Sequence, residues 1–378
     1  MQRKGGILLL LAILLTGCVQ TKTIEDLGII NTRGVDLIED NQLDTTIVIF
    51  KFDSKKQEVS KIVFGKGNTI KNARQHASYH TRFQLTPGAI DLEIYGTEAA
   101  KKGIMPYLDT LNRDARVSDT MSLAVSDTTA KEVIMSGEKS GIPNTGRYLH
   151  DLVQKNIKVN VIPRINLHDF VHFYFDRGRD PVLPSLGVKD GKPVLSSLAI
   201  FRDDKQVGNI PMKKAFYITM YNQTIKDLFI EIPLPLKPFA KYAYNMNKDE
   251  LDNRQFYTLL TVLNGKNKTK MTDVQNLKFQ TEVKLEVSLM EMTESISVKS
   301  QEAIKQMEKE IEKVVKHEYE KLLKELQTLN ADPFGYGTIY KANKSDGKLK
   351  RSEWRDKFPT IDVDFKVNVK ILRHGMVP

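Results

Sequence analysis

Two alternating segments in the last third of the chain constrain its fold more than any other feature. In residues 279–289 and again in 361–371, apolar side chains dominate the odd positions and polar side chains fill the even ones. Because side chains of a β-strand point alternately to its two faces, each segment is predicted to be a strand with one buried and one solvated face. We predict that the two strands belong to one sheet.

A long helix is predicted between these strands. Residues 297–329 carry apolar side chains at steps of three and four, from Ile304 to Leu329. A helix of this length measures about 50 Å. Only about four heptads are present, and they lack regularly spaced leucines, so packing across the chain's own sheet is favoured over a coiled coil with a partner.

Strands and helices of unequal length are interleaved in the rest of the chain. Strands are predicted at 27–30, 45–52, 90–95 and 121–125, and helices at 68–83, 98–111 and 128–135. Residues 137–147 are predicted to form a loop, and 176–193, with three prolines and three glycines, an irregular stretch.

This order predicts the α+β class with two or three mixed α/β domains. The expected parts are an N-terminal α/β region at 18–200, possibly two subdomains, and a C-terminal α+β domain at 205–378. In the second, a largely antiparallel sheet packs with the helix at 297–329.

The first 18 residues have the order of a secretory signal. Arg3 and Lys4 precede an apolar run from Gly5 to Leu15, which is too short to span a bilayer. The sequence Leu15-Thr16-Gly17-Cys18 follows at once and resembles the bacterial lipobox. We therefore expect residues 1–17 to be a lipoprotein signal peptide, cleaved between Gly17 and Cys18, with S-diacylglycerol and N-acyl groups on Cys18.

Composition limits the partners and the covalent chemistry. Cys18 is the only cysteine, so the fold is expected to rest on its core without disulfides. Removing Arg3 and Lys4 from the 57 Lys and Arg leaves 55 against 47 Asp and Glu, a net charge of +8. This mild excess suits attraction to anionic lipid. The sequence contains no stripe of basic residues with aromatic residues among them, so nucleic acid is not expected as a partner.

No motif in the chain predicts catalysis, a cofactor or a metal. His168 and His172 have the i, i+4 spacing of a zinc site, but Asp169 replaces the general-base Glu and no third ligand is evident. Residues 64–68 lack the Lys-Ser/Thr ending of a phosphate loop and are interpreted as a tight turn before a helix. We therefore expect a protein that is not an enzyme and has no cofactor.

The segment Asn330-Ala331-Asp332-Pro333-Phe334-Gly335-Tyr336-Gly337 follows the long helix. Asn and Pro are common stop signals there, so we interpret the segment as a helix terminator with packed aromatic rings, in preference to a loop that contacts a partner.

Several motifs, in order, resemble the Ger(x)C family, the lipoprotein C subunits of bacterial spore germinant receptors. They are the lipobox, Ile24 to Ile29, Gly34-Val35-Asp36, Asp169-Phe170, Gly178-Arg179-Asp180-Pro181, Leu198-Ala199-Ile200-Phe201, the 330–337 segment, Trp354, Phe358-Pro359 and Arg373-His374-Gly375. The chain departs from the family at Val19-Gln20 and at Ala89-Ile90-Asp91, where the family has Trp-Asp and a His-Leu-Lys run.

The resemblance implies a subunit of a nutrient receptor that acts in spore germination. Its expected partners are two integral membrane subunits of the same receptor and, through Cys18, membrane lipid. Its expected location is the outer face of the spore inner membrane. The alternative is a solute-binding lipoprotein of a membrane transporter, which would have two similar halves of repeating βαβ units around a cleft.

Overall fold

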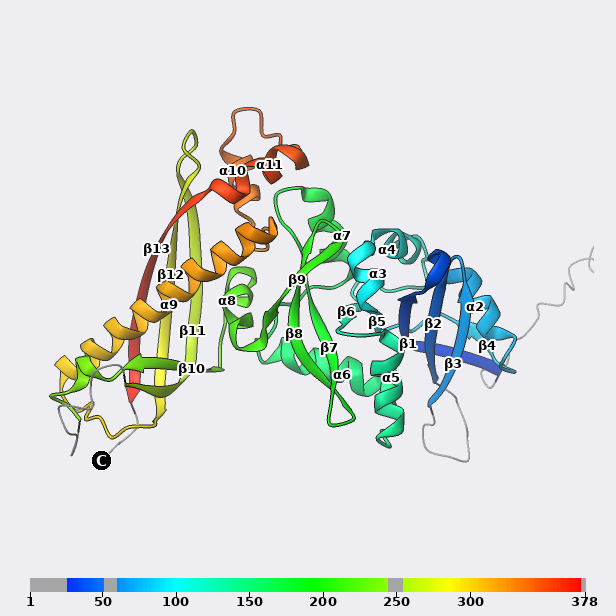
Figure 1. The fold of residues 1–378 in the computed structure, drawn as a ribbon, viewed down its shortest axis with the longest axis horizontal. Helices are drawn as coiled ribbons and strands as arrows, with labels where there is room; N and C mark the ends of the chain where they lie inside the picture. Colours follow the sequence, from blue (N-terminus) through cyan, green and yellow to red (C-terminus); the bar gives the residue numbers. More distant parts are fainter. Residues whose placement is uncertain (1–25, 51–59, 244–253, 375–378) are drawn as a thin grey trace, which may run out of the picture.

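The computed structural model describes residues 26–50, 60–243 and 254–374. Within them the chain forms two β-sheets, one of nine strands and one of four, placed side by side along the long axis (Figure 1). This is an α+β fold, as the sequence predicts. The two sheets are unequal, unlike the matched halves expected for the solute-binding alternative.

The first sheet contains β1 to β9 in the order β3-β2-β1-β5-β6-β7-β8-β9, with β4 paired to β1. The strands β1, β5, β6 and β7 are parallel neighbours, and the pairs at either end of the sheet are antiparallel. The bounds are β1 (Leu27–Leu37), β2 (Leu43–Phe50), β3 (Ser60–Gly67), β4 (Gln84–Thr86), β5 (Leu92–Tyr95), β6 (Ser122–Ser126), β7 (Val182–Lys189), β8 (Lys192–Arg202) and β9 (Lys205–Pro211).

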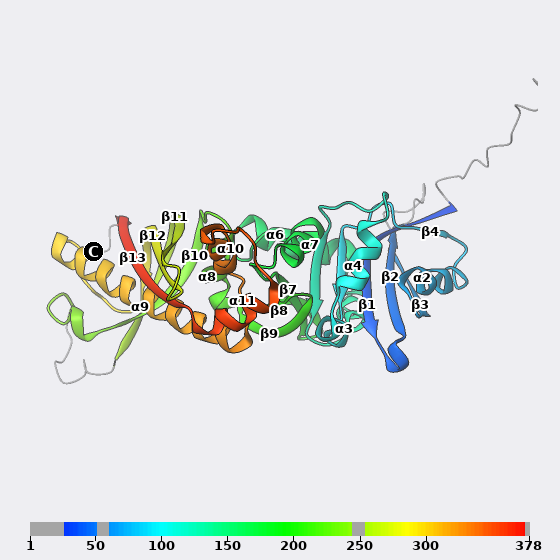
Figure 2. The same cartoon turned by 90° about the horizontal axis from the view of Figure 1, so that it is seen from above.

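Helices connect these strands and cover the sheet (Figures 1 and 2). They are α2 (Ile70–Ser78), α3 (Thr97–Lys102), α4 (Met105–Asn112), α5 (Ala130–Lys139), α6 (Thr145–Lys158), α7 (Leu167–Asp176) and α8 (Met212–Asn222). Polar residues define their starts: Thr69, Thr129, Asn144 and Asn166 each accept a hydrogen bond from a backbone N–H in the first turn.

The second sheet contains β10 (Leu228–Pro235), β11 (Gln255–Asp273), β12 (Lys278–Met292) and β13 (Asp362–His374), in that order. Its first three strands are antiparallel, and β13 is parallel to β12. Its helices are α9 (Gln301–Leu329), α10 (Tyr336–Asn343) and α11 (Arg351–Lys357). Short 3₁₀ turns lie at Glu39–Asn41, Lys237–Phe239 and Phe358–Thr360.

The alternating pattern places one face of this sheet in the core. Phe279, Val283, Val287 and Phe365 are buried, and the polar residues between them lie on the opposite face. The helix α9 lies across the buried face (Figure 2), where the ring of Tyr319 stacks on that of Phe365 at 5.3 Å. The largely antiparallel sheet, the shared sheet of the two strands and the packed long helix are thus confirmed.

Two glycines at the end of β3 allow α2 to lie directly against the strand. A Cβ atom on Gly65 would stand 2.0 Å from the carbonyl oxygen of Ala73 and 2.6 Å from the nitrogen of Ala77. The interpretation of residues 64–68 as a tight turn is therefore wrong for Gly65 and Gly67, which belong to the strand. They are required by the close approach of a helix.

Residues 176–193 are not the irregular stretch expected from their prolines and glycines. Most of them form α7's last residue, β7 and the start of β8. The turn between β7 and β8 is Asp190-Gly191, and both residues have positive φ, at 52° and 74°. An Asp-Gly pair is a strong hairpin signal because it tolerates this geometry. Hydrogen-bonded pairing with neighbouring strands therefore places this segment in the sheet despite its prolines.

One predicted helix and one predicted loop differ from the structure in extent. The helix expected at 98–111 is two helices, α3 and α4, separated at Gly103. The loop expected at 137–147 is shorter, since α5 runs to Lys139 and α6 begins at Thr145.

Candidate functional site

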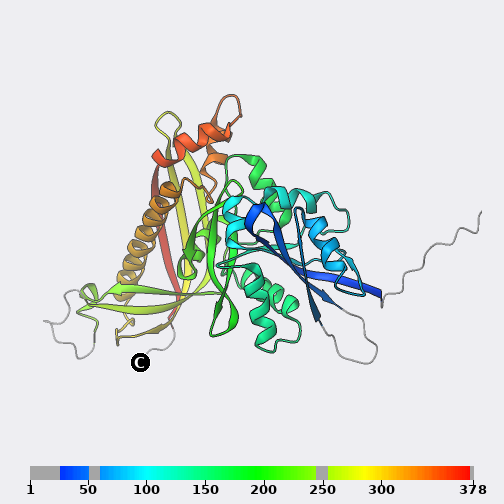
Figure 3. The same cartoon turned by 45° about the vertical axis from the view of Figure 1, so that its right-hand side comes forward.

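The residues predicted to carry the lipid, Gly17 and Cys18, lie outside the described residues. The candidate site that the structure does describe is a polar junction between the two sheets. It brings together residues 178–181, residues 330–337 and Trp354, which carry the family resemblance, and adds Arg355, which sequence reasoning did not single out. Figures 1 and 3 show α10 and α11 at the top of the four-stranded sheet, beside the end of α7.

Backbone hydrogen bonds join the first two segments directly. The N–H of Asp180 donates to the carbonyl oxygen of Asp332 at 2.9 Å, and the N–H of Thr338 donates to that of Gly178 at 2.9 Å. The N–H of Asp332 in turn donates to Asp180 Oδ2 at 2.7 Å. Three hydrogen bonds therefore join the two segments, although they are about 150 residues apart in the sequence.

Asp332 is fully buried and accepts several N–H groups. Gly335 N donates to its Oδ1 at 2.9 Å, and Gly337 N and Trp354 Nε1 donate to its Oδ2 at 2.9 and 3.1 Å. The pKa of Asp332 is raised from 3.8 to about 7, mainly by burial and also by nearby Asp180, while the backbone N–H groups act to lower it. The site thus holds a carboxyl group that is able to change its charge near neutral pH.

The indole of Trp354 lies against Gly337 and fixes this arrangement. A Cβ atom on Gly337 would stand 2.6 Å from Trp354 Nε1, so a side chain at this position would displace the indole from Asp332. Trp354 is buried and its ring stacks near that of Tyr340 at 5.6 Å. The close contact between Gly337 and Trp354 therefore requires both the glycine and the indole ring.

Arg355 binds two carboxylates from the first sheet. Its Nη1 and Nη2 lie 2.6 and 2.5 Å from the two oxygens of Asp180, and Nη2 lies 2.7 Å from Asp203 Oδ1. Asp180 is 2% exposed, so this bidentate pair is shielded from solvent. Arg351 Nε adds an ion pair to Asp203 at 3.0 Å. Residues of α11 thus attach the second sheet to the loop regions of the first.

Aromatic rings from α8 and from the 330–337 segment pack together at the same junction. Tyr221 stacks on Phe334 with ring centres 3.9 Å apart, and its hydroxyl lies 2.7 Å from that of Tyr336 and 3.0 Å from Thr281 Oγ1. Burial raises the pKa of Tyr221, so the hydroxyl stays protonated and serves as a hydrogen-bond donor. Asn330 ends α9 in the left-handed conformation. The 330–337 segment is a helix terminator with packed aromatic rings, as interpreted from the sequence.

A second buried ion pair, which sequence reasoning missed, lies within the first sheet. Arg33 on β1 faces Glu93 on β5, with Nη2 2.5 Å from Oε2, and both side chains are almost fully buried. The hydroxyl of Tyr95 donates to Glu93 at 2.8 Å. A charged residue inside a strand of β-formers is the signal that could have located each partner, but only strand pairing brings them together.

His168 and His172 form no metal site in the structure. Their rings stack at 6.3 Å on α7. In the part of the chain that the structure describes, no three His, Cys, Asp or Glu side chains are grouped closely enough to hold a metal ion.

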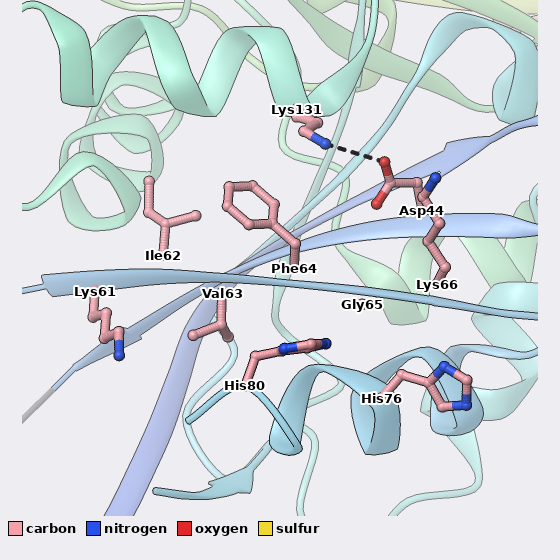
Figure 4. Close-up of a pocket in the computed structure, with 10 residues that line it drawn as sticks. All are labelled: Asp44, Lys61, Ile62, Val63, Phe64, Gly65, Lys66, His76, His80 and Lys131. Carbon is pink, nitrogen blue, oxygen red and sulfur yellow. Dashed lines mark hydrogen bonds and ion pairs between the residues drawn. The ribbon is translucent and has the colours of Figure 1, made fainter. Parts of the chain in front are cut away.

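A hollow of about 550 Å³ follows the outer edge of β3, which is the last strand of its sheet (Figure 4). Phe64 and Ile62 point to one side of the strand, toward Lys131, while His76 and His80 lie on the other side. Lys131 Nζ lies 3.2 Å from Asp44 Oδ2 and 4.8 Å from the centre of the Phe64 ring. The lining contains Lys61, Lys66 and Lys131 and the single carboxylate of Asp44, so the hollow is basic.

No helix within residues 26–50, 60–243 and 254–374 is long and apolar enough to cross a membrane.

The architecture is that of a two-part spore germination protein. The family model described as spore germination protein N-terminal domain matches residues 20–188, and the one described as spore germination B3/GerAC like, C-terminal, matches residues 196–375. The chain therefore belongs to the Ger(x)C family of spore germination receptor proteins. The resemblance seen in the motifs is confirmed.

Individual relatives agree with this assignment. The chain is similar to spore germination protein GerQC of Bacillus cereus, with 22% identity over 369 residues, which cover 97% of this chain and 98% of that protein. It is also similar in fold to the crystal structure of the GerBC protein, with a TM-score of 0.55 and 16% identity over 93% of this chain and 100% of that one.

Proposed function

We propose that this protein is a lipid-anchored receptor subunit that acts in spore germination by assembling with two integral membrane subunits in the spore inner membrane. The observation that carries the proposal is the match of the two germination-family models to nearly the whole chain after residue 20. The lipobox at Leu15 to Cys18 stands immediately before that match. Membership of the family and the anchor sequence together favour a peripheral subunit.

The proposed lipid attachment uses a single thiol, that of Cys18. The thiol of Cys18 takes a diacylglyceryl group from a phospholipid, whose phosphate-bearing headgroup leaves. Water then cleaves the peptide bond between Gly17 and Cys18, and the new amino group takes an acyl chain from a second phospholipid, which leaves as the lysophospholipid. Two or more acyl chains give stable attachment, whereas one chain binds only marginally. The protein then remains on the outer face of the membrane, next to the subunits that span it.

The role is one of assembly and not of catalysis. Members of this family are not known as enzymes. The polar junction supports this role, because a rigid connection between two sheets holds their surfaces in a fixed relation for binding other subunits. We propose no cofactor.

Replacement of Cys18 tests the proposal. In spores that carry Cys18→Ala as the only copy, we expect the protein to leave the membrane fraction, and germination on the receptor's nutrients to fall at least about tenfold in rate. Because Cys18 is the only cysteine, a labelled fatty acid that is incorporated into the wild-type chain and absent from Cys18→Ala reports on this position. Immunoblots of membrane and soluble fractions supply the second measurement.

Thr21→Ala, a change close to the anchor that retains the thiol, is the matched control and is expected to behave as wild type. A Cys18→Ala protein found in the spore membrane at normal level, with normal nutrient germination, would refute the anchoring role. Affinity purification of the wild-type chain from spore membranes should recover two membrane-spanning proteins. Their consistent absence would contradict the proposed assembly.

A further inference from the structure

The outer face of the four-stranded sheet, opposite α9, is rich in lysine. We define the lysine face by the outward side chains of β11, β12 and β13. Its basic residues are Lys266, Lys268, Lys270, Lys278, Lys284, Lys366, Lys370 and Arg373, and its acidic residues are Asp273, Glu282, Glu286, Glu291, Asp362 and Asp364. The face thus carries eight basic side chains and six acidic ones, a small excess of positive charge.

The pairing register gathers these charges into one patch. Lys268 lies opposite Glu282, which lies opposite Lys366, and Lys266 lies opposite Lys284. Glu282 is paired with Lys284 at 3.0 Å, and Glu286 accepts a hydrogen bond from Asn264. Lys266, Lys268 and Lys270 are exposed, and within the described residues no ion pair holds them. Their charges are available to an external partner.

The opposite side of the same unit has a different charge balance. Along α9, six lysines are offset by seven glutamates, several of them in ion pairs such as Lys313 with Glu310. The unit is therefore basic on its sheet side and slightly acidic on its helix side. Such a charge difference orients a molecule on an anionic surface with the sheet side down.

Apolar side chains lie at the end of the lysine face next to β10. Phe229 is 62% exposed and Tyr257 46% exposed, and the register places both on the same side of the sheet as Lys266. Phe229 lies opposite Thr261, five residues along β11 from Lys266, and Glu231 follows it on the same side of β10. Aromatic rings on the same side of a sheet as lysines suit the headgroup level of a bilayer, where the rings are buried and the ammonium groups contact phosphate.

The lysine face lies far from the start of β1. Figures 1 and 2 place β1 and the four-stranded sheet at opposite ends of an elongated molecule. We propose that the lysine face binds the anionic lipid surface of the membrane to which the chain is tethered. The inference deepens the proposed function and rests on it for the membrane. A molecule that is tethered near one end and bound electrostatically at the other lies along the membrane surface. The tether strengthens the electrostatic contact, because it keeps the lysine face at a high effective concentration near the lipid.

Vesicle binding tests the inference without the lipid anchor. The probe is the mature chain from residue 18 with Cys18→Ala, mixed with vesicles of phosphatidylglycerol and phosphatidylcholine or of phosphatidylcholine alone. We expect sedimentation with the anionic vesicles only, and release as the salt concentration rises. The triple variant Lys266→Gln, Lys268→Gln, Lys270→Gln is expected to bind at least about tenfold more weakly.

The matched control is Lys305→Gln, Lys309→Gln, Lys324→Gln on the exposed side of α9, which removes the same charge and should change binding by less than about twofold. Circular dichroism and thermal unfolding should match wild type for both variants, since all six lysines are exposed.

Absence of binding to anionic vesicles, or equal loss in both triple variants, would overturn the inference. Normal vesicle binding by the sheet variant, combined with loss of its receptor partners, would instead assign the lysine face to an acidic protein. Because the assayed chain has no acyl group, failure here leaves the Cys18 anchor intact, and failure of the anchor leaves this result intact.

Discussion

Asp332 is a single carboxyl group at the point where the two sheets meet. Three N–H donors surround its oxygens, and its own backbone pairs with Asp180 from the first sheet. Donors of this kind can be satisfied only by an acceptor, so the residue type is determined by its surroundings. The energetic cost of burying this group is offset by hydrogen bonds that join distant parts of the chain.

Asp332→Asn should lower the free energy of unfolding by about 2–3 kcal/mol, because the amide NH₂ would face an N–H donor and leave both unsatisfied. Urea titration followed by circular dichroism measures the change. Asp362→Asn, an exposed carboxylate on β13, is the control and should shift stability by less than about 0.5 kcal/mol. Equal effects at the two positions would contradict the role given to Asp332.

The raised pKa of Asp332 makes stability depend on pH. In the unfolded chain its pKa is 3.8, and in the folded chain it is about 7. The folded state therefore retains a proton that the unfolded state has released, so the stability from this group is complete below about pH 4 and is lost as the pH rises to about 7. From about pH 5 to pH 8 the wild type should lose more stability than Asp332→Asn, and parallel profiles would contradict this.

At the scale of elements, α9 protects the outer edge of β13. This strand is the last of its sheet, and its backbone donors at Ile371 and Val369 point to Glu308 Oε1 and Glu312 Oε1 at 2.8 and 3.0 Å. Edge strands with free backbone donors pair readily with other chains. The two glutamates thus give α9 a second role beyond burying the sheet.

Replacing both glutamates with alanine should expose that edge. We expect the double variant Glu308→Ala, Glu312→Ala to associate as its concentration rises, and to lose about 1–2 kcal/mol of stability. Sedimentation velocity at several concentrations measures the association. Alanine at Glu302 and Glu320, exposed on the same helix, removes equal charge without touching β13 and should leave the chain unassociated. Association of both variants would point to charge alone.

At the scale of the whole molecule, the junction makes one body from two sheets. The buried apolar residues form a continuous core that extends through both sheets, and Arg355 adds polar contacts between them. Loss of Arg355 would leave Asp180 buried without its bidentate partner. Removing one member of a buried pair costs about 3–5 kcal/mol.

Arg355→Ala should therefore separate the unfolding of the two sheets. Calorimetry of the wild type is expected to give one transition, and that of the variant two, with the first at lower temperature. Arg113→Ala, which breaks the exposed pair with Asp109, serves as the control and should keep a single transition at the wild-type midpoint. A single unshifted transition in Arg355→Ala would exclude a coupling role for this residue.

The sequence by itself determined features that depend on local periodicity or on ordered motifs. The alternation in 279–289 and 361–371 specified two strands with one buried face, and the three-to-four spacing after residue 297 specified α9, because side-chain direction along regular backbone is periodic. The order of the motifs determined the family. The composition also showed that the fold has no disulfide, since Cys18 is alone.

Only the tertiary structure decided which distant residues meet. The prolines and glycines of 176–193 favoured a loop, yet β7 and β8 pair there because neighbouring strands satisfy their backbone groups. The motifs around Asp180, Asp332 and Trp354 could be recognised singly, but nothing local required them to form one buried cluster. Long-range contact depends on how the sheets pack, and that packing assigns a structural role to residues whose motifs alone identified only a family.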